Sequence, residues 1–365
     1  MYWCNNCLNA STRPRISFDD NGLCNACQWA NEKKYINWKK RQNEFIKKIK
    51  SSVSKNKFYD CIVPVSGGKD GSYVAYTLKN KFNLNPLTVT VRPPLETSLG
   101  KKNLENFINK GFDHIHISPD NNLMRDLNKM GFILKGFPYY GWLISIHTAI
   151  LRVATSLKIN FIVYGEDGEV EYGGSTLTKN TPFYNANYQK KIYLEGGHKK
   201  ILSKIKTADS KKYFFEFPLE AELKNIKLTH WSYFENWDPY RNYLVAKKHC
   251  GLLEKDNLND GTFTNFAQND QWLYALHTYL MYIKFGFGRA TQDAGIEVRR
   301  GAMTRDQAIN LVKMYDNNYP SKYEKLYLDY FKLSKKEFNK IIDKWANKKL
   351  FKKKLGKWIP KFTHK

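Results

Sequence analysis

Short apolar runs alternate with longer amphipathic stretches through the first half of the chain. The runs are rich in Val, Ile and aromatic residues and predict buried parallel strands at 59–65, 86–91, 114–117 and 160–164. The stretches that follow these runs predict helices at 73–81, 101–110, 122–130 and 141–157. Alternating strands and helices predict an α/β fold with a doubly wound parallel sheet, which binds ligands at the carboxyl ends of its strands.

Beyond about residue 220 the pattern becomes mostly helical, with aromatic residues throughout. Helices are expected at 239–250, 268–285, 304–316 and 335–348. We therefore divide the chain into a cysteine-containing module at 1–30, a Lys-rich helical linker at 31–57, an α/β domain at 58–220 and a helical region at 221–365.

Two closely spaced pairs of cysteines lie near the start of the chain. Cys4 and Cys7 are separated by two residues, as are Cys24 and Cys27, and sixteen residues lie between the pairs. This spacing is typical of a zinc site with four thiolate ligands. Two redox-active pairs are the alternative, which is disfavoured because neither pair begins a helix after a buried strand. Since four thiolates leave no open coordination position, we expect structural Zn²⁺ that stabilises a small module.

The N-terminal residues lack the basic start and apolar core of a secretory signal. No apolar run reaches the roughly 20 residues of a membrane helix. We therefore expect a soluble, cytoplasmic protein. In a reducing compartment, paired thiols favour a metal site over disulfides.

The first predicted strand is followed by a loop and then by a predicted helix. The loop reads Ser66-Gly67-Gly68-Lys69-Asp70-Gly71-Ser72. Its glycines allow backbone N–H groups to approach an anion, and the helix N-terminus adds a favourable dipole. The loop matches neither the Walker A pattern nor the dinucleotide pattern G-x-G-x-x-G. A glycine turn without function is the alternative, which the flanking strand and helix disfavour.

The net charge of +26 comes from 60 Lys and Arg residues against 34 Asp and Glu residues. Such an excess is typical of proteins that bind nucleic acid. Only 11 of the basic residues are Arg and the chain has 34 Asn, so we favour a Lys-rich solvated surface that attracts small polyanions. In the last 35 residues, lysines alternate with Ile341, Trp345, Leu350 and Phe351. That pattern predicts an amphipathic basic helix that docks an acidic partner or an anionic membrane surface.

The sequence Val65-Ser66-Gly67-Gly68-Lys69-Asp70 resembles the pyrophosphate loop (PP-loop) of the ATP pyrophosphatase superfamily. The resemblance implies a Rossmann-like sheet of the adenine nucleotide alpha hydrolase type that binds ATP and Mg²⁺. Members adenylate a substrate oxygen, release pyrophosphate and let a nitrogen or sulfur nucleophile displace AMP. The common pattern is SGGxDS, whereas this chain has Gly71 in the last position, followed by Ser72. That departure leaves open which hydroxyl contacts the β- and γ-phosphates.

Further segments resemble a narrower family, the N-acetyl sugar amidotransferases of surface-polysaccharide (LPS O-antigen) and flagellin-sugar pathways, including pseudaminic and legionaminic acid. The segments are the four cysteines, Leu99-Gly100-x-x-Asn103-Leu104, Gly165-Glu166-Asp167-Gly168-Glu169-Val170-Glu171-Tyr172-Gly173-Gly174, Gly261-Thr262-Phe263-Thr264-Asn265, Lys284-Phe285-Gly286-Phe287-Gly288-Arg289-Ala290-Thr291 and Arg299-Arg300-Gly301. The resemblance implies that an acetamido group of a nucleotide sugar becomes an acetamidino group. It also implies that a separate glutaminase subunit supplies ammonia, HisH-like and in some systems accompanied by a HisF-like subunit. This agrees with the absence of a glutaminase nucleophile elbow from the sequence.

The chemistry and the resemblance assign candidate roles to residues of this chain. Catalysis is expected of Lys69, Asp70, Glu169 and Glu171, of which the last two are also candidates for binding sugar hydroxyls or steering ammonia. ATP and Mg²⁺ are expected at Ser66, Gly67, Gly68, Lys69, Asp70, Gly71, Ser72, Val91, Gly165, Glu166 and Asp167. The phosphates or the sugar of the substrate are expected at Tyr172, Lys284, Arg289, Arg299 and Arg300, because Arg matches phosphate geometry. Solvated loop carboxylates and surface salt bridges are the alternatives for the acids and the arginines.

Two other functions fit parts of the sequence. A tRNA-modifying enzyme of the same superfamily, a thiolase or lysidine synthetase, is favoured by the charge and the zinc module. Thiolases, however, carry several cysteines beyond the loop, where this chain has only Cys250. A non-catalytic zinc- and nucleotide-binding adaptor would have no need of Lys69 and Asp70. The sequence therefore favours an amidotransferase acting on a small molecule, with no nucleic-acid partner.

Overall fold

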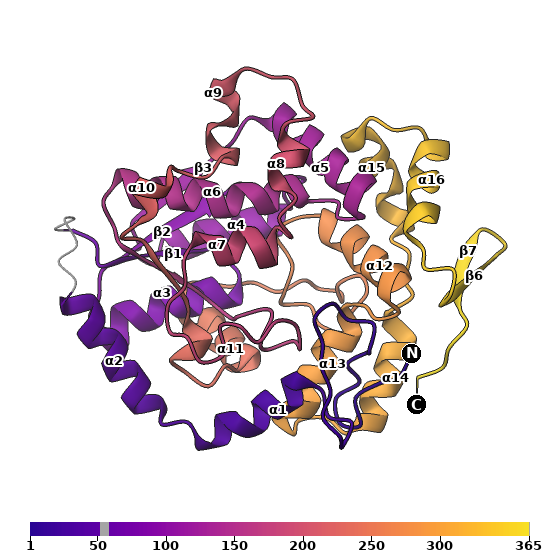
Figure 1. Ribbon diagram of the computed structural model, residues 1–365, viewed down its shortest axis with the longest axis horizontal. Helices are drawn as coiled ribbons and strands as arrows, with labels where there is room; N and C mark the ends of the chain where they lie inside the picture. Colours follow the sequence, from indigo (N-terminus) through magenta and orange to yellow (C-terminus); the bar gives the residue numbers. More distant parts are fainter. Residues whose placement is uncertain (52–57, 365) are drawn as a thin grey trace.

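A five-stranded parallel sheet forms the centre of the structure (Figure 1). The computed structural model describes residues 1–51 and 58–364. The strand order is β3-β2-β1-β4-β5, that of a doubly wound sheet whose switch point lies between β1 and β4. The strands are β1 (Cys61–Pro64), β2 (Pro86–Val91), β3 (His114–Ile117), β4 (Phe161–Tyr164) and β5 (Lys227–His230). The predicted α/β fold and parallel sheet are confirmed.

Alternate residues of the central strands face two different apolar cores, because side chains of a strand point to opposite faces. Val63 and Phe161 pack with side chains of α3 (Lys69–Phe82) and α11 (Pro239–Cys250) on one face. Ile62 and Val89 pack with side chains of α6 (Tyr140–Ser156) on the other. Both faces of the sheet are therefore covered, as expected for parallel strands.

The helices of the α/β part begin at side-chain caps that the sequence supplies. Thr97 accepts a hydrogen bond from Gly100 N at 2.9 Å and starts α4 (Ser98–Ile108). Asp120 accepts from Leu123 N at 2.8 Å and starts α5 (Asn121–Lys135), which ends at Gly136 with a φ of 62°. The structure thus agrees with the helices predicted between the strands, although α5 is longer than its apolar pattern indicated.

β5 is a feature that the sequence pattern missed. It lies in the part of the chain that was predicted to be mostly helical, and it completes the sheet by pairing with β4. Its four residues, Lys227 to His230, are too few to show a period. Only short helices lie between β4 and β5: α7 (Ala186–Tyr188), the π-helix η2 (Gln189–Tyr193), α8 (His198–Leu202), α9 (Asp209–Lys212), η3 (Tyr213–Phe215) and α10 (Glu220–Leu223).

The C-terminal region is built from helices around a separate aromatic-rich core. Leu276 and Ile283 from one helix pack with Phe331 and Phe338 from two others. A short 3-10 helix, η4 (Trp231–Tyr233), links β5 to α11. The remaining elements are α12 (Leu273–Phe285), α13 (Arg289–Arg300), α14 (Arg305–Tyr315), η5 (Ser321–Tyr323), α15 (Glu324–Phe331) and α16 (Lys335–Trp345).

The predicted basic amphipathic helix at the C-terminus forms over residues 335–345 only, and its apolar face is covered by the chain itself. The helix α16 ends at Trp345, and the chain continues as an antiparallel hairpin of β6 (Phe351–Lys354) and β7 (Lys357–Pro360). Ile341 and Phe351 are buried in the core around α12. Because the apolar residues pack against the chain itself, they offer no stripe to a partner or a membrane.

The N-terminal module lies against the C-terminal helices α13 and α14 (Figure 1). The second cysteine pair of the module lies at the start of α1 (Asn25–Glu32), which is followed by η1 (Lys33–Tyr35) and α2 (Trp38–Ser51). The helical part of the predicted linker corresponds to α2, and residues 52–57 lie outside the described residues. Within the described part of the chain, no helix combines the length and apolar character that a membrane crossing requires.

Candidate active site and metal centre

The loop between β1 and α3 is held in a conformation that requires glycine. Gly67 has a φ of +74°, and a Cβ at this position would lie 2.4 Å from Leu104 N and 2.6 Å from Asn103 C. A Cβ at Gly100 would likewise lie 2.4 Å from the Cα of Asp270. The N-terminal half of α4 therefore packs directly between the loop and a C-terminal segment, which explains the glycines of both motifs.

The first turn of α3 faces a cavity of about 250 Å³, which we call the loop cavity. Gly68 is the N-cap residue of α3. No side chain among the described residues caps the free N–H groups of the first turn of this helix. These N–H groups and the helix dipole are suited to an anion. The cavity is lined by Ser66, Gly68, Lys69, Asp70, Gly71, Gly100, Asn103, Glu166, Leu252, Phe266, Ala267, Gln268, Asn269, Asp270, Tyr274 and Arg289.

Two of the three carboxyl groups that line the loop cavity lie close together, one from the first turn of α3 and one from the loop after β4. Asp70 forms an ion pair with Lys69, and its Oδ1 accepts from Asn242 Nδ2 at 3.2 Å. Burial, and next the neighbouring Asp70 carboxylate, raise the pKa of Glu166 to about 8. One or two carboxylates beside bound phosphates are the usual protein ligands of Mg²⁺. Asp70 and Glu166 therefore fit a magnesium ion held between the chain and a polyphosphate.

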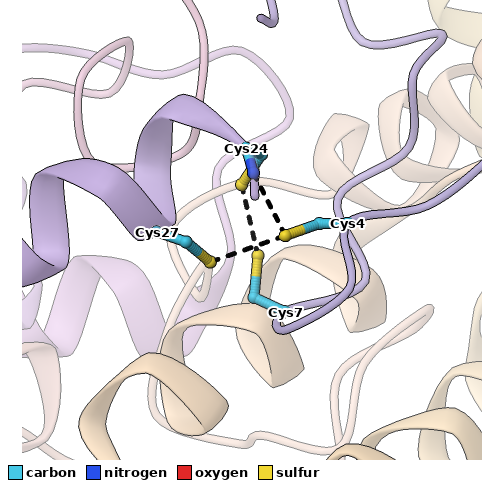
Figure 2. Close-up of side chains that lie close together, drawn as sticks. All are labelled: Cys4, Cys7, Cys24 and Cys27. Atoms are coloured by element: carbon cyan, nitrogen blue, oxygen red, sulfur yellow. Dashed lines mark hydrogen bonds between the residues drawn. The ribbon is translucent and has the colours of Figure 1, made fainter. Parts of the chain in front are cut away.

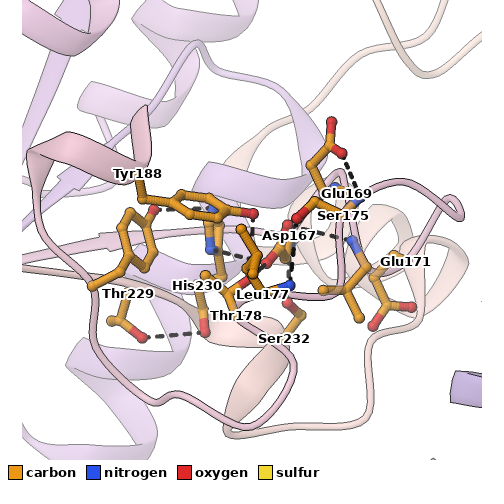
Figure 3. Close-up of polar contacts among 12 residues, drawn as sticks. Asp167, Glu169, Glu171, Ser175, Leu177, Thr178, Tyr188, Thr229, His230 and Ser232 are labelled. Carbon is orange, nitrogen blue, oxygen red and sulfur yellow. Dashed lines mark hydrogen bonds and ion pairs between the residues drawn. The ribbon is translucent and has the colours of Figure 1, made fainter. Parts of the chain in front are cut away.

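Asp167 is not among the residues that line this cavity, and its contacts organise the loop that follows β4 (Figure 3). Its backbone N–H donates to Ser232 Oγ at 3.0 Å, and its Oδ1 accepts from Glu169 N at 3.0 Å. Thr178 Oγ1 donates to Oδ2, and His230 Nδ1 lies 3.7 Å from the same oxygen. The buried carboxylate of Asp167 is thus occupied by contacts with other residues of the chain, and these contacts fix the conformation of the loop.

Glu169 and Glu171 face the N-terminal module and do not line the loop cavity. Arg15 binds both carboxylate oxygens of Glu169, at 2.8 Å from Nε and 2.7 Å from Nη2. Glu171 pairs with Lys33 Nζ at 2.8 Å and accepts from Trp29 Nε1 at 2.9 Å. Both acids therefore have partners in the N-terminal part of the chain. The sequence predicted them as catalytic residues, or as residues that bind sugar hydroxyls or steer ammonia.

The residues that were predicted to bind the phosphates or the sugar of the substrate do not lie at one site. Arg289 lines the loop cavity and forms an ion pair with Asp293 at 2.8 Å. Arg299 donates to Glu171 O at 3.1 Å, and Arg300 pairs with Asp238 at 3.2 Å. Both arginines line a separate cavity of about 290 Å³, together with Tyr172.

Three other predicted residues lie away from both cavities. Lys284 donates to Lys135 O at 2.8 Å, and its ammonium lies 4.9 Å from the centroid of the Trp345 ring. The carbonyl oxygen of Val91 accepts from Trp142 Nε1 at 3.1 Å. Ser72 is fully buried in α3, and its hydroxyl has no hydrogen-bond partner among the described residues. Gly165, in contrast, lies beside Asp70, whose Cβ would be 3.2 Å from a Cβ at the glycine.

One wall of the loop cavity was not predicted from the sequence. It is formed by the segment 266–270 and by Tyr274, with Asn242 behind Asp70. The signal that could have found this wall is the polar run Gln268-Asn269-Asp270, two residues after the motif at 261–265. Gln268 has a φ of 56°, which is unusual for a residue other than glycine and is typical of functional loops.

The four cysteines of the module form one buried cluster (Figure 2). Their sulfur atoms all lie within 4.8 Å of one another, with Cys7 to Cys24 at 3.5 Å and Cys4 to Cys27 at 3.7 Å. A tetrahedron with Zn–S bonds of about 2.3 Å has S···S edges of about 3.8 Å. Asn9 Nδ2 donates to Cys24 Sγ at 3.3 Å, the kind of outer contact that stabilises zinc thiolates. The cluster therefore fits the Zn²⁺ predicted from the sequence.

Two asparagines of the module, one of which also contacts the cysteine cluster, bind the loop after β4. Asn9 Nδ2 also donates to Tyr172 O at 3.1 Å, and Asn25 Nδ2 donates to Gly174 O at 2.7 Å. A Cβ at Gly173, which has a φ of +89°, would lie 2.8 Å from Asn9 Nδ2. The cysteine module and the loop 166–174 are thus packed as one unit.

Comparison with known proteins adds one family for the C-terminal part of the chain. Residues 260–362 match the model of the LPS biosynthesis protein WbpG-like, C-terminal domain. This WbpG-like region supplies Arg289, Asn269 and Asp270 to the wall of the loop cavity. No curated protein matches the chain.

Two solved structures show a weak similarity to the chain. One is the U34-tRNA thiolase NcsA from Methanococcus maripaludis with its [4Fe-4S] cluster, at 16% identity and a TM-score of 0.35, covering 83% of this chain and 87% of that one. The other is a predicted subunit of tRNA methyltransferase from Methanocaldococcus jannaschii, at 14% identity and a TM-score of 0.28, covering 60% of this chain and 86% of that one. Similarity at this level does not bear on the function of the present chain.

Proposed function

We propose that the protein is an ATP-dependent, AMP-forming amidotransferase that converts the acetamido group of an N-acetylated nucleotide sugar into an acetamidino group. The observation that carries this proposal is the loop cavity, where the glycine loop and first turn of α3 face Arg289 of the WbpG-like region. An anion-binding helix N-terminus is thereby joined to a region similar to a protein of LPS biosynthesis.

The loop cavity supplies what cleavage of ATP between its α- and β-phosphates requires. Backbone N–H groups of the first turn of α3 and the hydroxyl of Ser66 are placed to bind pyrophosphate. Lys69 and Arg289 neutralise charge that develops on the phosphates. Asp70 and Glu166 would hold Mg²⁺, which supplies further charge neutralisation at the leaving pyrophosphate.

The reaction balances with ammonia as the only other reactant. The amide oxygen of the substrate forms a bond to the α-phosphorus while the bond to the β-phosphate oxygen breaks and pyrophosphate leaves. Ammonia then adds to the activated carbon, loses a proton, and AMP departs with the former amide oxygen. The catalytic contribution of the chain is mainly positioning and electrostatic stabilisation of phosphate charge.

The ammonia is proposed to come from a separate glutaminase subunit. Outside the metal cluster the chain has two cysteines, Cys61 and Cys250, and both are buried. Burial raises the pKa of the Cys250 thiol to about 12, and burial raises that of Cys61 as well. Neither thiol is suited to act as a glutaminase nucleophile or as the sulfur carrier of a tRNA thiolase. We therefore retain the tRNA-modifying function only as the outcome that would replace this proposal.

A direct assay tests the proposal. The protein is incubated with ATP, Mg²⁺, ammonium and a panel of N-acetylated nucleotide sugars, and AMP and pyrophosphate are measured. We expect AMP and pyrophosphate only with an acetamido sugar. The sugar product should have a lower mass than its substrate, by the difference between O and NH. Release of AMP with bulk tRNA but with none of the sugars would contradict the proposal.

A further inference from the structure

A second cavity of about 250 Å³ opens beside the loop cavity. Lys69, Phe266 and Arg289 line both cavities and form the boundary between them. Aromatic side chains form much of the wall of this second cavity, so we call it the aromatic cavity. It is lined by Lys69, Tyr172, Pro239, Tyr240, Phe263, Thr264, Asn265, Phe266, Ala267, Arg289, Asp293, Ile296, Glu297 and Met303.

A third cavity, of about 290 Å³, continues from the aromatic cavity toward the N-terminal module. The two share Tyr172, Pro239 and Ile296. We call the third one the basic cavity, because it is lined by four cationic side chains and two carboxylates. It is formed by Ala30, Lys33, Lys34, Glu171, Tyr172, Asn236, Trp237, Asp238, Pro239, Ile296, Arg299 and Arg300. The three cavities therefore follow one another from the PP-loop to the module.

Each of the two new cavities contains a buried polar atom that has no partner in the protein. Thr264 lines the aromatic cavity and Trp237 lines the basic cavity, and the Oγ1 of the first and the Nε1 of the second are buried. Neither atom has a hydrogen-bond partner anywhere in residues 1–51 or 58–364. Buried donors are nearly always paired in native proteins, so a ligand group that reaches either atom would supply the missing partner.

The charge of the basic cavity is only partly compensated by the chain. Lys33 pairs with Glu171 at 2.8 Å and Arg300 pairs with Asp238 at 3.2 Å. Lys34 donates to Asn31 Oδ1 at 3.1 Å and forms no ion pair within the described residues. Its ammonium is therefore available to an anion that enters this cavity.

The shapes and surfaces of the two cavities suit different parts of one molecule. Aromatic rings interleaved with hydroxyl and amide groups are suited to a sugar ring, which has apolar C–H faces and polar edges. Ammonium and guanidinium groups are suited to phosphates. Each cavity alone falls just short of the volume typical of small-molecule sites, roughly 300–1,000 Å³, and together they fall within it.

We propose that the aromatic cavity holds the N-acetylated sugar of the acceptor, with its amide at the Lys69–Arg289 boundary, and that the basic cavity holds a diphosphate carrier. This inference rests on the proposed function and adds the acceptor's orientation. It also gives the N-terminal module a part in substrate binding, because Lys33 and Lys34 directly follow α1. A nucleoside and a lipid carrier share the diphosphate that this cavity recognises.

Binding measurements on the full, zinc-loaded chain test the proposal. The loop cavity is first saturated with Mg²⁺ and α,β-methylene ATP, which cannot release pyrophosphate. Three probes are then titrated by calorimetry: UDP, UDP-N-acetylglucosamine and geranyl-diphosphate-linked N-acetylglucosamine. We expect binding of UDP-N-acetylglucosamine if the carrier is a nucleoside and of the geranyl probe if it is a lipid, and either result supports the diphosphate site.

Two variants test the orientation. Lys34→Ala should weaken every diphosphate probe that binds by about tenfold, the value of one lost charged contact. Thr264→Val, which keeps the shape of the side chain, should weaken the probes that carry the sugar and leave UDP unchanged. Lys39→Ala, at an exposed position of α2, is the matched control and should change neither.

Failure of this inference is distinguishable from failure of the proposed function. If the protein binds α,β-methylene ATP but none of the three probes, the acceptor site is wrong and the ATP site stands. Binding that Lys34→Ala leaves unchanged would likewise overturn the diphosphate assignment. If α,β-methylene ATP itself does not bind, the proposed function fails first.

Discussion

Arg15 holds both carboxylate oxygens of Glu169, with contacts of 2.8 Å and 2.7 Å. One partner belongs to the cysteine module and the other to the loop that carries Glu166 into the loop cavity. Glu169 also accepts from Ser175 N at 2.6 Å, so its carboxylate joins the module to both ends of this loop. The pair therefore connects the metal centre to the candidate active site.

Removing that connection should loosen the loop without unfolding the protein. Glu169→Gln should lower the free energy of unfolding by about 1–3 kcal/mol, because a buried charged hydrogen bond is lost. Hydrogen exchange of the amides of 166–175 should accelerate, whereas that of α12 should not. Unchanged exchange in this loop would show that the pair does not order it.

The loop between β1 and α3 requires glycine at position 67. Gly67→Ala should cost about 1–3 kcal/mol for a positive φ and should weaken ATP binding further, since its Cβ meets Leu104 N at 2.4 Å. Gly168→Ala is the matched control, because nothing lies within 4 Å of its Cβ. Calorimetry with α,β-methylene ATP measures both variants. Equal affinities would contradict the anion-binding role of the loop.

Zinc is expected to be required for the fold of the N-terminal module. Cys24→Ser should lower bound zinc, measured by elemental analysis, and should lower solubility and thermal stability, because binding of a structural metal contributes folding free energy. Cys61→Ser, at a buried thiol outside the cluster, controls for the loss of a cysteine. A Cys24→Ser protein that is active and free of zinc would show that the metal is dispensable.

Asp316 should make stability depend on pH. It accepts hydrogen bonds from Gly288 N at 2.8 Å and from Thr291, and so caps α13 from a distant part of the chain. Burial raises the pKa of Asp316 to about 6. A carboxyl whose pKa is higher in the folded state contributes stability below its unfolded pKa of about 3.9, and that contribution is lost as the pH rises through about 6.

Thermal unfolding between pH 4 and pH 7 checks this sign. The wild type should lose stability across the interval relative to Asp316→Asn, which has no titrating group there. Asp306→Asn removes an exposed carboxylate from α14 and serves as the control. Parallel pH profiles for the wild type and Asp316→Asn would refute the assignment.

The sequence predicted elements whose signal is local. The bounds of β2, β3 and α11 agree with the predicted ranges, because each has a clear run of apolar residues or a cap such as Asp238 before Pro239. The cysteine spacing likewise predicted a cluster that the structure brings together. The helix α13 was missed because glycines punctuate its segment and its cap, Asp316, comes from beyond α14.

Features that depend on packing between distant segments could not be predicted from the sequence pattern. The loop cavity combines Asp70, Glu166, Asn269 and Arg289, which come from four separate segments. Nothing in the sequence indicated that Glu169 would pair with Arg15 of the module, or Glu171 with Lys33 just after it. The apolar residues of the basic tail likewise pack inward, because α12 offers them a core that periodicity cannot show.

Loss of Asp70 should abolish the reaction. Asp70→Asn should lower AMP release at least about a hundredfold, because the carboxylate beside Lys69 and Glu166 no longer binds the metal–phosphate unit. Circular dichroism and thermal unfolding should show a folded protein. Turnover near the wild-type rate would contradict the assignment of the loop.

The transfer of the amide oxygen tests the central claim most directly. Nucleotide sugars carrying ¹⁸O in the acetamido carbonyl are incubated with the protein, ATP, Mg²⁺ and ammonium, and the products are analysed by mass spectrometry. Adenylation of the amide predicts that ¹⁸O appears in the phosphate of AMP and is absent from the acetamidino product. AMP that forms with these sugars but carries no ¹⁸O would contradict this account.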